Sequence, residues 1–310
     1  MTGPSSQPSP PLAEALAAGP VVLDGGLSNQ LEADGHDLSD ALWSARLLAE
    51  DPEAVVRAHL AYYRAGAQVA ITASYQATFE GFARRGTGPE EAAGLLRRSV
   101  ALAREAAARA GATGTAGPLY VAASAGPYGA MLADGSEYRG QYGLSVDALE
   151  RFHRPRLEVL AAARPDVLAL ETVPDADEAR ALLRAVRGLG VPAYLSYSIA
   201  GDRTRAGQPL AEAFAPLADA DEVIAVGVNC CAPDDADAAV ALAADITGKP
   251  VVVYPNSGER WDAAARTWRG SPAFPAGRVA GWVASGARLI GGCCRVGPET
   301  IAELAAVLGR

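Results

Sequence analysis

The residues with the most distinctive chemistry are four cysteines in two adjacent pairs, Cys230-Cys231 and Cys293-Cys294. This layout is poor for a secreted disulfide framework and better for metal or redox chemistry. Soft thiolates in a tetrahedral arrangement suit zinc, and three protein ligands leave the fourth position open for a substrate. Spacing alone leaves three interpretations open: a zinc site, inert thiols that fill core volume, and disulfide or redox chemistry.

The elements that position these cysteines are predicted from short apolar runs, each followed by a turn and an Ala/Leu-rich amphipathic segment. Continuous apolar runs are typical of strands buried on both faces, and strands that alternate with helices pair in parallel. Eight units is the number in a (β/α)8 TIM barrel, so we predict this α/β fold, although an open doubly wound sheet would show the same alternation. The runs are PVVLD (20–24), AQVAIT (67–72), PLYVAAS (118–124), DVLALET (166–172), VPAYLSYS (191–198), EVIAVGVN (222–229), PVVVYP (250–255) and ARLIGG (287–292).

Helices are predicted between these strands, and several of them open with Asp-Pro, Pro-Glu or Pro-Asp, which is the signature of a helix start. The segments are 51–66, 89–110, 175–190, 233–248 and 298–309. Residues 1–12 are rich in Pro, Ser and Gly and lack apolar periodicity, so we predict a disordered lead-in. The remaining residues, 13–310, then form one barrel domain.

Polar residues cluster where the predicted strands end, and a barrel would bring all these ends to one face, where its active site lies. They include Asp24, Thr72, Ser124, Glu171, Asn229 and Asn256. Cys230 ends the sixth strand and Cys293-Cys294 end the eighth, so all three would meet at this mouth. Alternation points Cys231 to the opposite face, and we expect Gly291-Gly292 to let the chain turn sharply before the second pair.

Composition excludes several classes of partner. The 310 residues are half hydrophobic and carry 36 acidic against 27 basic side chains, a formal charge of −9, with no basic run that could follow a nucleic acid backbone. No signal peptide and no long apolar segment occur. The sequence therefore predicts a soluble cytoplasmic protein with no nucleic acid or membrane partner.

Motifs distributed from about residue 20 to the C-terminus resemble those of the homocysteine S-methyltransferases, most closely the branch that uses S-methylmethionine. GVNC together with GGCC is highly specific for this family. The motifs are LDGGLSNQLE (23–32), ITASYQATFEGF (71–82), GSEYRGQY (135–142), ALETVPDADEA (169–179), GVNCC (227–231), VYPNSGERWD (253–262) and GGCCR (291–295). The second cysteine after GVNC departs from the family pattern.

The resemblance implies zinc as cofactor and transfer of a methyl group from a small sulfonium, S-methylmethionine or S-adenosylmethionine, to homocysteine, giving methionine. It implies Cys230, Cys293 and Cys294 as zinc ligands. Asp24, Gly25, Gly26 and Glu171 match positions that hold the amino acid part of homocysteine. The chain has no length for the folate and cobalamin domains of related methionine synthases.

Further contacts are expected from chemistry at the strand ends. Ser74 and Asn229 are candidates for substrate contact, although hydroxyl groups at such positions often satisfy local backbone groups. Tyr128, Tyr138 and Tyr142 could face a sulfonium as aromatic rings face a quaternary ammonium, or they could simply pack a loop.

Two other functions remain as alternatives. One is a zinc-sequestering or redox-sensing protein that uses its cysteines without catalysis. The other is a barrel lyase or aldolase with Gly291-Gly292 as a phosphate cradle, which is disfavoured because the only lysine, Lys249, precedes a strand. The histidines His36, His59 and His153 show no ligand pattern, and we interpret them as structural or exposed.

Overall fold

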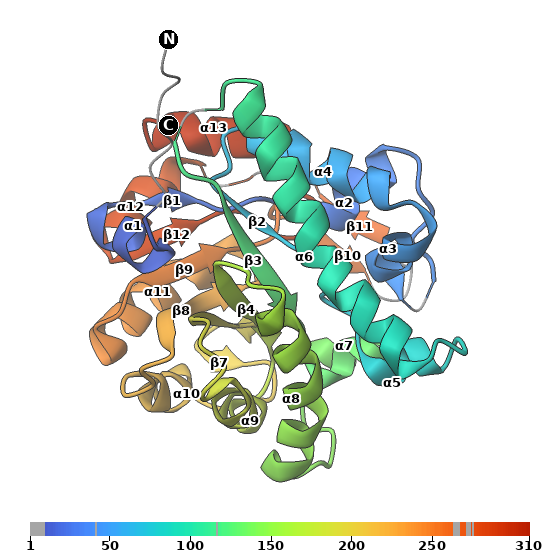
Figure 1. Ribbon diagram of the computed structural model, residues 1–310. Coiled ribbons are helices and arrows are strands. Elements are labelled where there is room, and N and C mark those ends of the chain that lie inside the picture. The colour runs from blue at the N-terminus through green and yellow to red at the C-terminus, as the bar shows by residue number, and fades with distance from the viewer. Residues whose placement is uncertain (1–9, 41, 116, 263–266, 271–273, 275) are drawn as a thin grey trace.

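The computed structural model describes residues 10–40, 42–115, 117–262, 267–270, 274 and 276–310. Eight parallel strands form the central sheet, in the order β1-β12-β9-β8-β5-β4-β3-β2 (Figure 1). The ends of this order meet through a parallel bridge between Leu23 and Val69, and the Asp24 N–H donates to the Val69 carbonyl at 3.0 Å. The strands therefore close into the predicted TIM barrel, and the open-sheet alternative is wrong.

All eight predicted strands are present, within the predicted ranges or one residue beyond them. They are β1 (Val21–Val22), β2 (Val69–Ile71), β3 (Tyr120–Ala125), β4 (Val167–Val173), β5 (Ala193–Tyr197), β8 (Val223–Asn229), β9 (Val251–Tyr254) and β12 (Ala287–Ile290).

The helices surround the strands (Figure 1). Four of the predicted ones begin with proline as their first residue, where the missing N–H costs no hydrogen bond. The helices are α1 (Leu12–Ala18), α2 (Leu27–Ala33), α3 (Leu47–Glu50), α4 (Pro52–Arg64), α5 (Phe79–Ala83), α6 (Pro89–Ala112), α7 (Tyr128–Leu132), α8 (Val146–Ala162), α9 (Ala176–Val186), α10 (Leu210–Phe214), α11 (Pro233–Thr247), α12 (Val279–Ala284) and α13 (Pro298–Val307).

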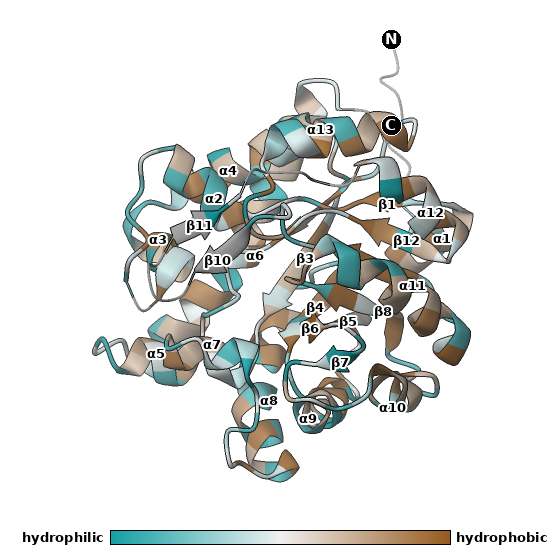
Figure 2. Cartoon of the chain, turned by 180° about the vertical axis from the view of Figure 1, so that it is seen from behind, coloured by the Kyte–Doolittle hydropathy of each residue, from teal (hydrophilic) through white to brown (hydrophobic). Residues whose placement is uncertain are grey.

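The core has two layers. The larger layer fills the space between the strands and the helices, and the smaller one fills the barrel interior. Figure 2 shows the central strands β4 and β12 in brown, whereas α13 alternates teal and brown because only one of its faces is buried. The polar strand ends therefore stand on a tightly packed base.

The N-terminal end of the barrel is covered by α1, which the sequence analysis did not predict. Leu12 and Leu16 are buried against strand residues of the barrel interior, and the Tyr120 hydroxyl donates to the Pro10 carbonyl at 3.0 Å. Of the predicted lead-in, residues 1–9 lie outside the described part of the chain.

Two short antiparallel hairpins were also not predicted. One pairs β6 (Ile199–Ala200) with β7 (Arg203–Thr204), and the other pairs β10 (Arg260–Asp262) with β11 (Thr267–Arg269). The first follows the C-terminal end of β5 directly, so it stands at the mouth of the barrel.

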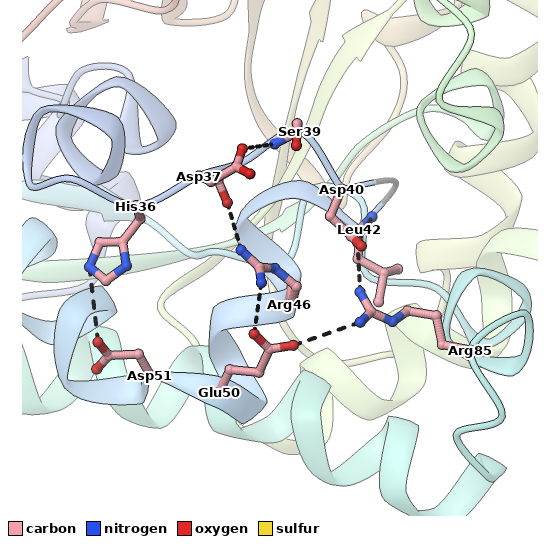
Figure 3. A network of polar contacts seen from close by, with 9 residues as sticks. All are labelled: His36, Asp37, Ser39, Asp40, Leu42, Arg46, Glu50, Asp51 and Arg85. Atoms are coloured by element: carbon pink, nitrogen blue, oxygen red, sulfur yellow. Dashed lines mark hydrogen bonds and ion pairs between the residues drawn. The ribbon is translucent and has the colours of Figure 1, made fainter.

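A polar network fixes the segment between α2 and α4 (Figure 3). Arg46 pairs with Glu50 at 2.8 Å, and Arg85 pairs with Asp40 at 2.7 Å and with Glu50 at 3.7 Å. These exposed pairs contribute little each, but together they hold the 3-10 helix η1 (Trp43–Arg46) against the region after α5.

Among the described residues, no helix is both long enough and apolar enough to cross a membrane. The cytoplasmic location stays a prediction from the sequence.

Candidate metal centre

Three cysteine thiols meet at the C-terminal mouth of the barrel. The Sγ atoms of Cys230, Cys293 and Cys294 all lie within 4.8 Å of one another, and Cys230 Sγ lies 3.6 Å from Cys294 Sγ. Cys230 is buried, whereas Cys293 and Cys294 are partly exposed. Residues more than sixty positions apart are thus brought together as the sequence predicted, and the cluster could hold a metal ion.

Backbone turns at the strand ends aim these thiols. Cys230 has a φ of 51°, a left-handed conformation that ends β8, and its N–H donates to the Tyr254 carbonyl at 3.2 Å. The second pair is held by the segment after β9, because the Cys293 N–H donates to the Pro255 carbonyl at 2.8 Å and Asn256 Oδ1 accepts from the Cys294 N–H at 3.2 Å. The ends of strands β8, β9 and β12 therefore position the three thiols together.

The turn after β12 differs from the expectation in its detail. Neither Gly291 nor Gly292 has a positive φ, and the left-handed residue is Arg295, with a φ of 64°. A Cβ on Gly291 would lie 2.5 Å from the Asp24 carbonyl oxygen. The glycine is needed for close approach of two strand ends, not for left-handed backbone.

Cys231 points away from the cluster. It is fully buried within the layer of apolar side chains between strands and helices, and burial raises the pKa of its thiol well above the usual range. An un-ionised thiol in an apolar environment behaves as a small hydrophobic side chain.

The three clustered thiols act electrostatically as a unit. Hydrogen bonds from Cys293 and Cys294 lower the pKa of Cys230 well below its usual value, and the same bonds to Cys230 raise the pKa of the other two thiols. The protein alone therefore stabilises negative charge at this point, which is the property that a cation site requires.

Two buried carboxyl groups face the same mouth. Burial raises the pKa of Asp24 well above its usual range and the pKa of Glu171 to about 7, and the charge of Glu171 raises the pKa of Asp24 further. Glu171 accepts hydrogen bonds from Ser124 Oγ and, at 3.0 Å, from Tyr254 Oη. Asp24 Oδ2 accepts from the Ile71 N–H at 2.8 Å, whereas its buried Oδ1 has no partner among the described residues.

Gly25 and Gly26 connect this carboxylate region to the cysteine turn. A Cβ on Gly25 would lie 2.2 Å from the Val296 carbonyl oxygen, and one on Gly26 would lie 2.7 Å from the Cys293 carbonyl oxygen. The Gly26 N–H donates to the Val296 carbonyl at 2.9 Å. Only residues without a side chain fit here, and the Gly26 N–H is already used within the protein.

Asn229 joins the ends of β4 and β8. Its Oδ1 accepts from the Thr172 N–H and its Nδ2 donates to Thr172 Oγ1, both at 2.8 Å, and its Oδ1 also accepts from Ser196 Oγ at 2.8 Å. Thr172 has a φ of 58°, which is strained for a β-branched residue. Asn229 therefore fixes the two strand ends that carry Glu171 and Cys230.

Ser74 is part of a hydroxyl chain below Glu171. Its Oγ donates to the Ser124 carbonyl at 2.8 Å and lies 2.7 Å from Thr72 Oγ1. Since Ser124 Oγ in turn donates to Glu171, these hydroxyl groups support the carboxylate from beneath.

The three candidate tyrosines lie in different surroundings. Tyr138, in the 3-10 helix η2 (Ser136–Tyr138), places its hydroxyl 3.4 Å from Cys230 Sγ. Tyr128 instead packs on Tyr142, with ring centroids 5.2 Å apart, and on Phe152 at 4.9 Å.

Three other side chains near this mouth were not predicted from the sequence. Burial, followed by the nearby charges of Glu137 and Cys230, raises the pKa of Tyr75 well above its usual value. The Trp43 ring lies 6.4 Å from the Tyr75 ring, edge to face. Burial raises the pKa of Glu137 to about 7, and its buried Oε2 has no partner among the described residues. Tyr75 lies in the motif ITASYQATFEGF and Glu137 in the motif GSEYRGQY, so the family motifs could have identified both as candidate site residues.

Known proteins match the chain over nearly its whole length. Residues 21–308 match the profile of the Homocysteine S-methyltransferase family. The chain is similar to Homocysteine S-methyltransferase of Escherichia coli (strain K12), with 47% identity over 92% of this chain and 94% of that protein, and to Homocysteine S-methyltransferase 4 of Zea mays, with 46% identity over 93% and 89%.

A solved structure extends the agreement to three dimensions. The metallated form of the homocysteine methyltransferase MmuM from Escherichia coli superposes with a TM-score of 0.87 and 45% identity, covering 96% of this chain and 99% of that one. Sequence motifs, barrel and cysteine cluster agree with one another, and the chain is therefore a member of the homocysteine S-methyltransferase family.

Proposed function

We propose that this chain transfers a methyl group from a small sulfonium donor to homocysteine, giving methionine, at a zinc ion held by Cys230, Cys293 and Cys294. The thiol cluster is the observation that carries the proposal. Thiolates arranged tetrahedrally around zinc at about 2.3 Å lie about 3.8 Å apart. The separations here, 3.6 Å for one pair and at most 4.8 Å for the others, fit that geometry.

Bound zinc lowers the pKa of a thiol that coordinates it, so homocysteine would be present as its thiolate at neutral pH. The three cysteine thiolates carry more negative charge than a divalent ion neutralises, which favours a cationic donor over a neutral one. Partial burial of the cluster also favours the reaction, because a thiolate and a sulfonium lose their charges as the methyl group moves.

The acceptor's amino acid group would be bound beside the cluster by Asp24 and Glu171. Two buried carboxyls that repel each other, one of them with an oxygen that has no partner among the described residues, suit an ammonium group, because an arriving cation relieves the repulsion. Gly25 keeps the strand end close to the cysteine turn, so the acceptor would be fixed relative to the zinc ligands. Alignment of sulfur with the methyl carbon is the main catalytic requirement.

The donor would approach from the side of Tyr138, whose hydroxyl lies next to Cys230. An aromatic ring attracts a sulfonium by the same electrostatics as a quaternary ammonium. S-methylmethionine and S-adenosylmethionine both satisfy this chemistry, and S-methylmethionine fits the quoted motifs better.

The test offers S-methylmethionine, S-adenosylmethionine and betaine separately to the zinc-loaded protein with homocysteine, and scores methionine formation. We expect turnover with a sulfonium that is lost on chelation and restored by zinc. A protein that retains zinc, binds no homocysteine and makes no methionine with any donor would support the zinc-sequestering alternative. Reductant is kept throughout, so that cysteine oxidation does not imitate inactivity.

A further inference from the structure

Arg205 stands at the mouth of the barrel, directly after β7. Its backbone N–H donates to the Ser198 carbonyl at 3.2 Å, and its side-chain Nε donates to Ser198 Oγ at 3.3 Å. Its guanidinium carbon lies 5.8 Å from the centroid of the Tyr138 ring. The hairpin and the tyrosine thus hold a half-buried cation in a defined place.

This cation is two contacts away from the thiol cluster. Tyr138 Oη lies 3.4 Å from Cys230 Sγ, and Ser198 Oγ, the acceptor for Arg205, itself donates to the Cys230 carbonyl at 3.3 Å. Arg205 therefore belongs to the surroundings of the reacting atoms and not to the outer surface.

Arg205 has no carboxylate within ion-pair distance among the residues that the structure describes. Neighbouring arginines are paired: Arg203 lies 3.9 Å from Asp202, and Arg295 lies 2.7 Å from Glu259. The Arg205 Nη atoms make no hydrogen bond among the described residues and are not enclosed, so they can receive an anion from another molecule through charge-assisted hydrogen bonds. The planar fork of a guanidinium matches a carboxylate in a bidentate arrangement.

We propose that Arg205 binds the carboxylate of the methyl donor, so that the donor class is a sulfonium that also carries an amino acid carboxylate. This inference rests on the proposed function. The acceptor's ammonium is matched by carboxyl groups on the ends of β1 and β4, whereas Arg205 lies with Tyr138 on the side from which the donor would approach. The donor's carbon chain separates its sulfonium from its carboxylate, so the sulfonium would face the thiolates while the carboxylate faces the guanidinium.

The test compares S-methylmethionine with its primary carboxamide, which keeps the sulfonium and removes the negative charge. In the wild type we expect kcat/KM to be about 10- to 100-fold higher for the acid than for the amide, the range of a hydrogen-bonded charge pair. Arg205→Gln should lose this preference, mainly through a higher KM for the acid, with a much smaller effect on the amide. Arg203→Gln, on the same hairpin, is the matched control and should keep the preference.

Calorimetric binding of the acid and the amide to zinc-loaded protein gives a second readout without turnover, and thermal melting with metal content shows that each variant is folded. The inference is overturned if Arg205→Gln weakens acid and amide equally, since Arg205 would then only support Tyr138, or if it changes neither. Wild-type protein that binds the acid without making methionine would refute the proposed function alone. Wild-type protein that binds neither compound would refute both.

Discussion

Two separate alanine substitutions should affect different properties: Cys231→Ala should lower the stability of the fold, and Cys294→Ala should lower its metal content. Cys231 is fully buried in the apolar layer, so its loss removes one packed atom and leaves a small cavity. By analogy with removal of one buried methyl group, we expect a loss of about 1 kcal/mol in the free energy of unfolding and of roughly 2 °C in Tm. Metal content should stay at the wild-type level.

Cys294→Ala should have the opposite profile. Its thiol is partly exposed and lies 3.6 Å from Cys230 Sγ, so little packing is lost but one thiolate of the cluster disappears. A structural zinc site contributes about 10–16 kcal/mol, and an equal share for four ligands gives about 3 kcal/mol each. We therefore expect zinc affinity to fall by at least about 100-fold.

The assay measures zinc per chain after dialysis against a chelator of intermediate affinity, together with Tm and methionine formation, for the wild type and both variants. We expect the Cys231→Ala protein to be metal-loaded, active and slightly less stable, and the Cys294→Ala protein to be metal-free and inactive. If Cys231→Ala loses its zinc while Cys294→Ala retains it, the assignment of ligands is wrong.

Three further predictions concern the substrate side. Tyr254→Phe removes the hydrogen bond of 3.0 Å to Glu171. In steady-state kinetics it should raise the KM for homocysteine about 10-fold and the KM for the donor less. Equal increases in both KM values would contradict the assignment of Glu171 to homocysteine. Burial raises the pKa of Glu171 to about 7, so its negative charge is lost as the pH falls below 7. The KM for homocysteine should therefore rise toward pH 5.5. A Glu171→Gln protein with the same pH dependence would exclude this carboxyl as the cause. In Gly25→Ala the new Cβ would lie 2.2 Å from the Val296 carbonyl oxygen, so we expect the free energy of unfolding by denaturant to fall by about 1–3 kcal/mol and the zinc affinity to fall as well. Gly19→Ala, with open space around the new Cβ, should change neither quantity.

The fold could be predicted from the sequence because its signals are local. A buried strand such as Val167–Val173 is a continuous apolar run, and Pro52 or Pro233 marks a helix start by its own covalent geometry. The hairpin that precedes Arg205 gave no such signal, because β6 and β7 have only two residues each and both residues of β7, Arg203 and Thr204, are polar.

The candidate site could be predicted only where residue type alone identified the chemistry. The thiols were identifiable, and so was the choice of Cys230 over Cys231, since strand alternation separates neighbours. The position of the Tyr75 ring near the thiol cluster could not be predicted, because its direction depends on packing against Trp43, which comes from another segment of the chain. The close approach that requires Gly291 is likewise a tertiary contact.

Asn229 explains why thiols from separate strands can meet with little freedom to move. Thr172 and Cys230 both adopt left-handed backbone, which costs on the order of 1–3 kcal/mol at each such residue unless the surroundings fix it. The Asn229 amide offsets this cost by bonding both the N–H and the hydroxyl of Thr172 while its own backbone leads directly into Cys230. The strain at Thr172 is therefore held by the Asn229 side chain, whereas the Cys230 backbone is held by the Tyr254 carbonyl and Ser198 Oγ. Because Thr172 follows Glu171 and Cys230 follows Asn229, we expect a change in the Asn229 amide to displace the Glu171 carboxylate and the Cys230 thiol together.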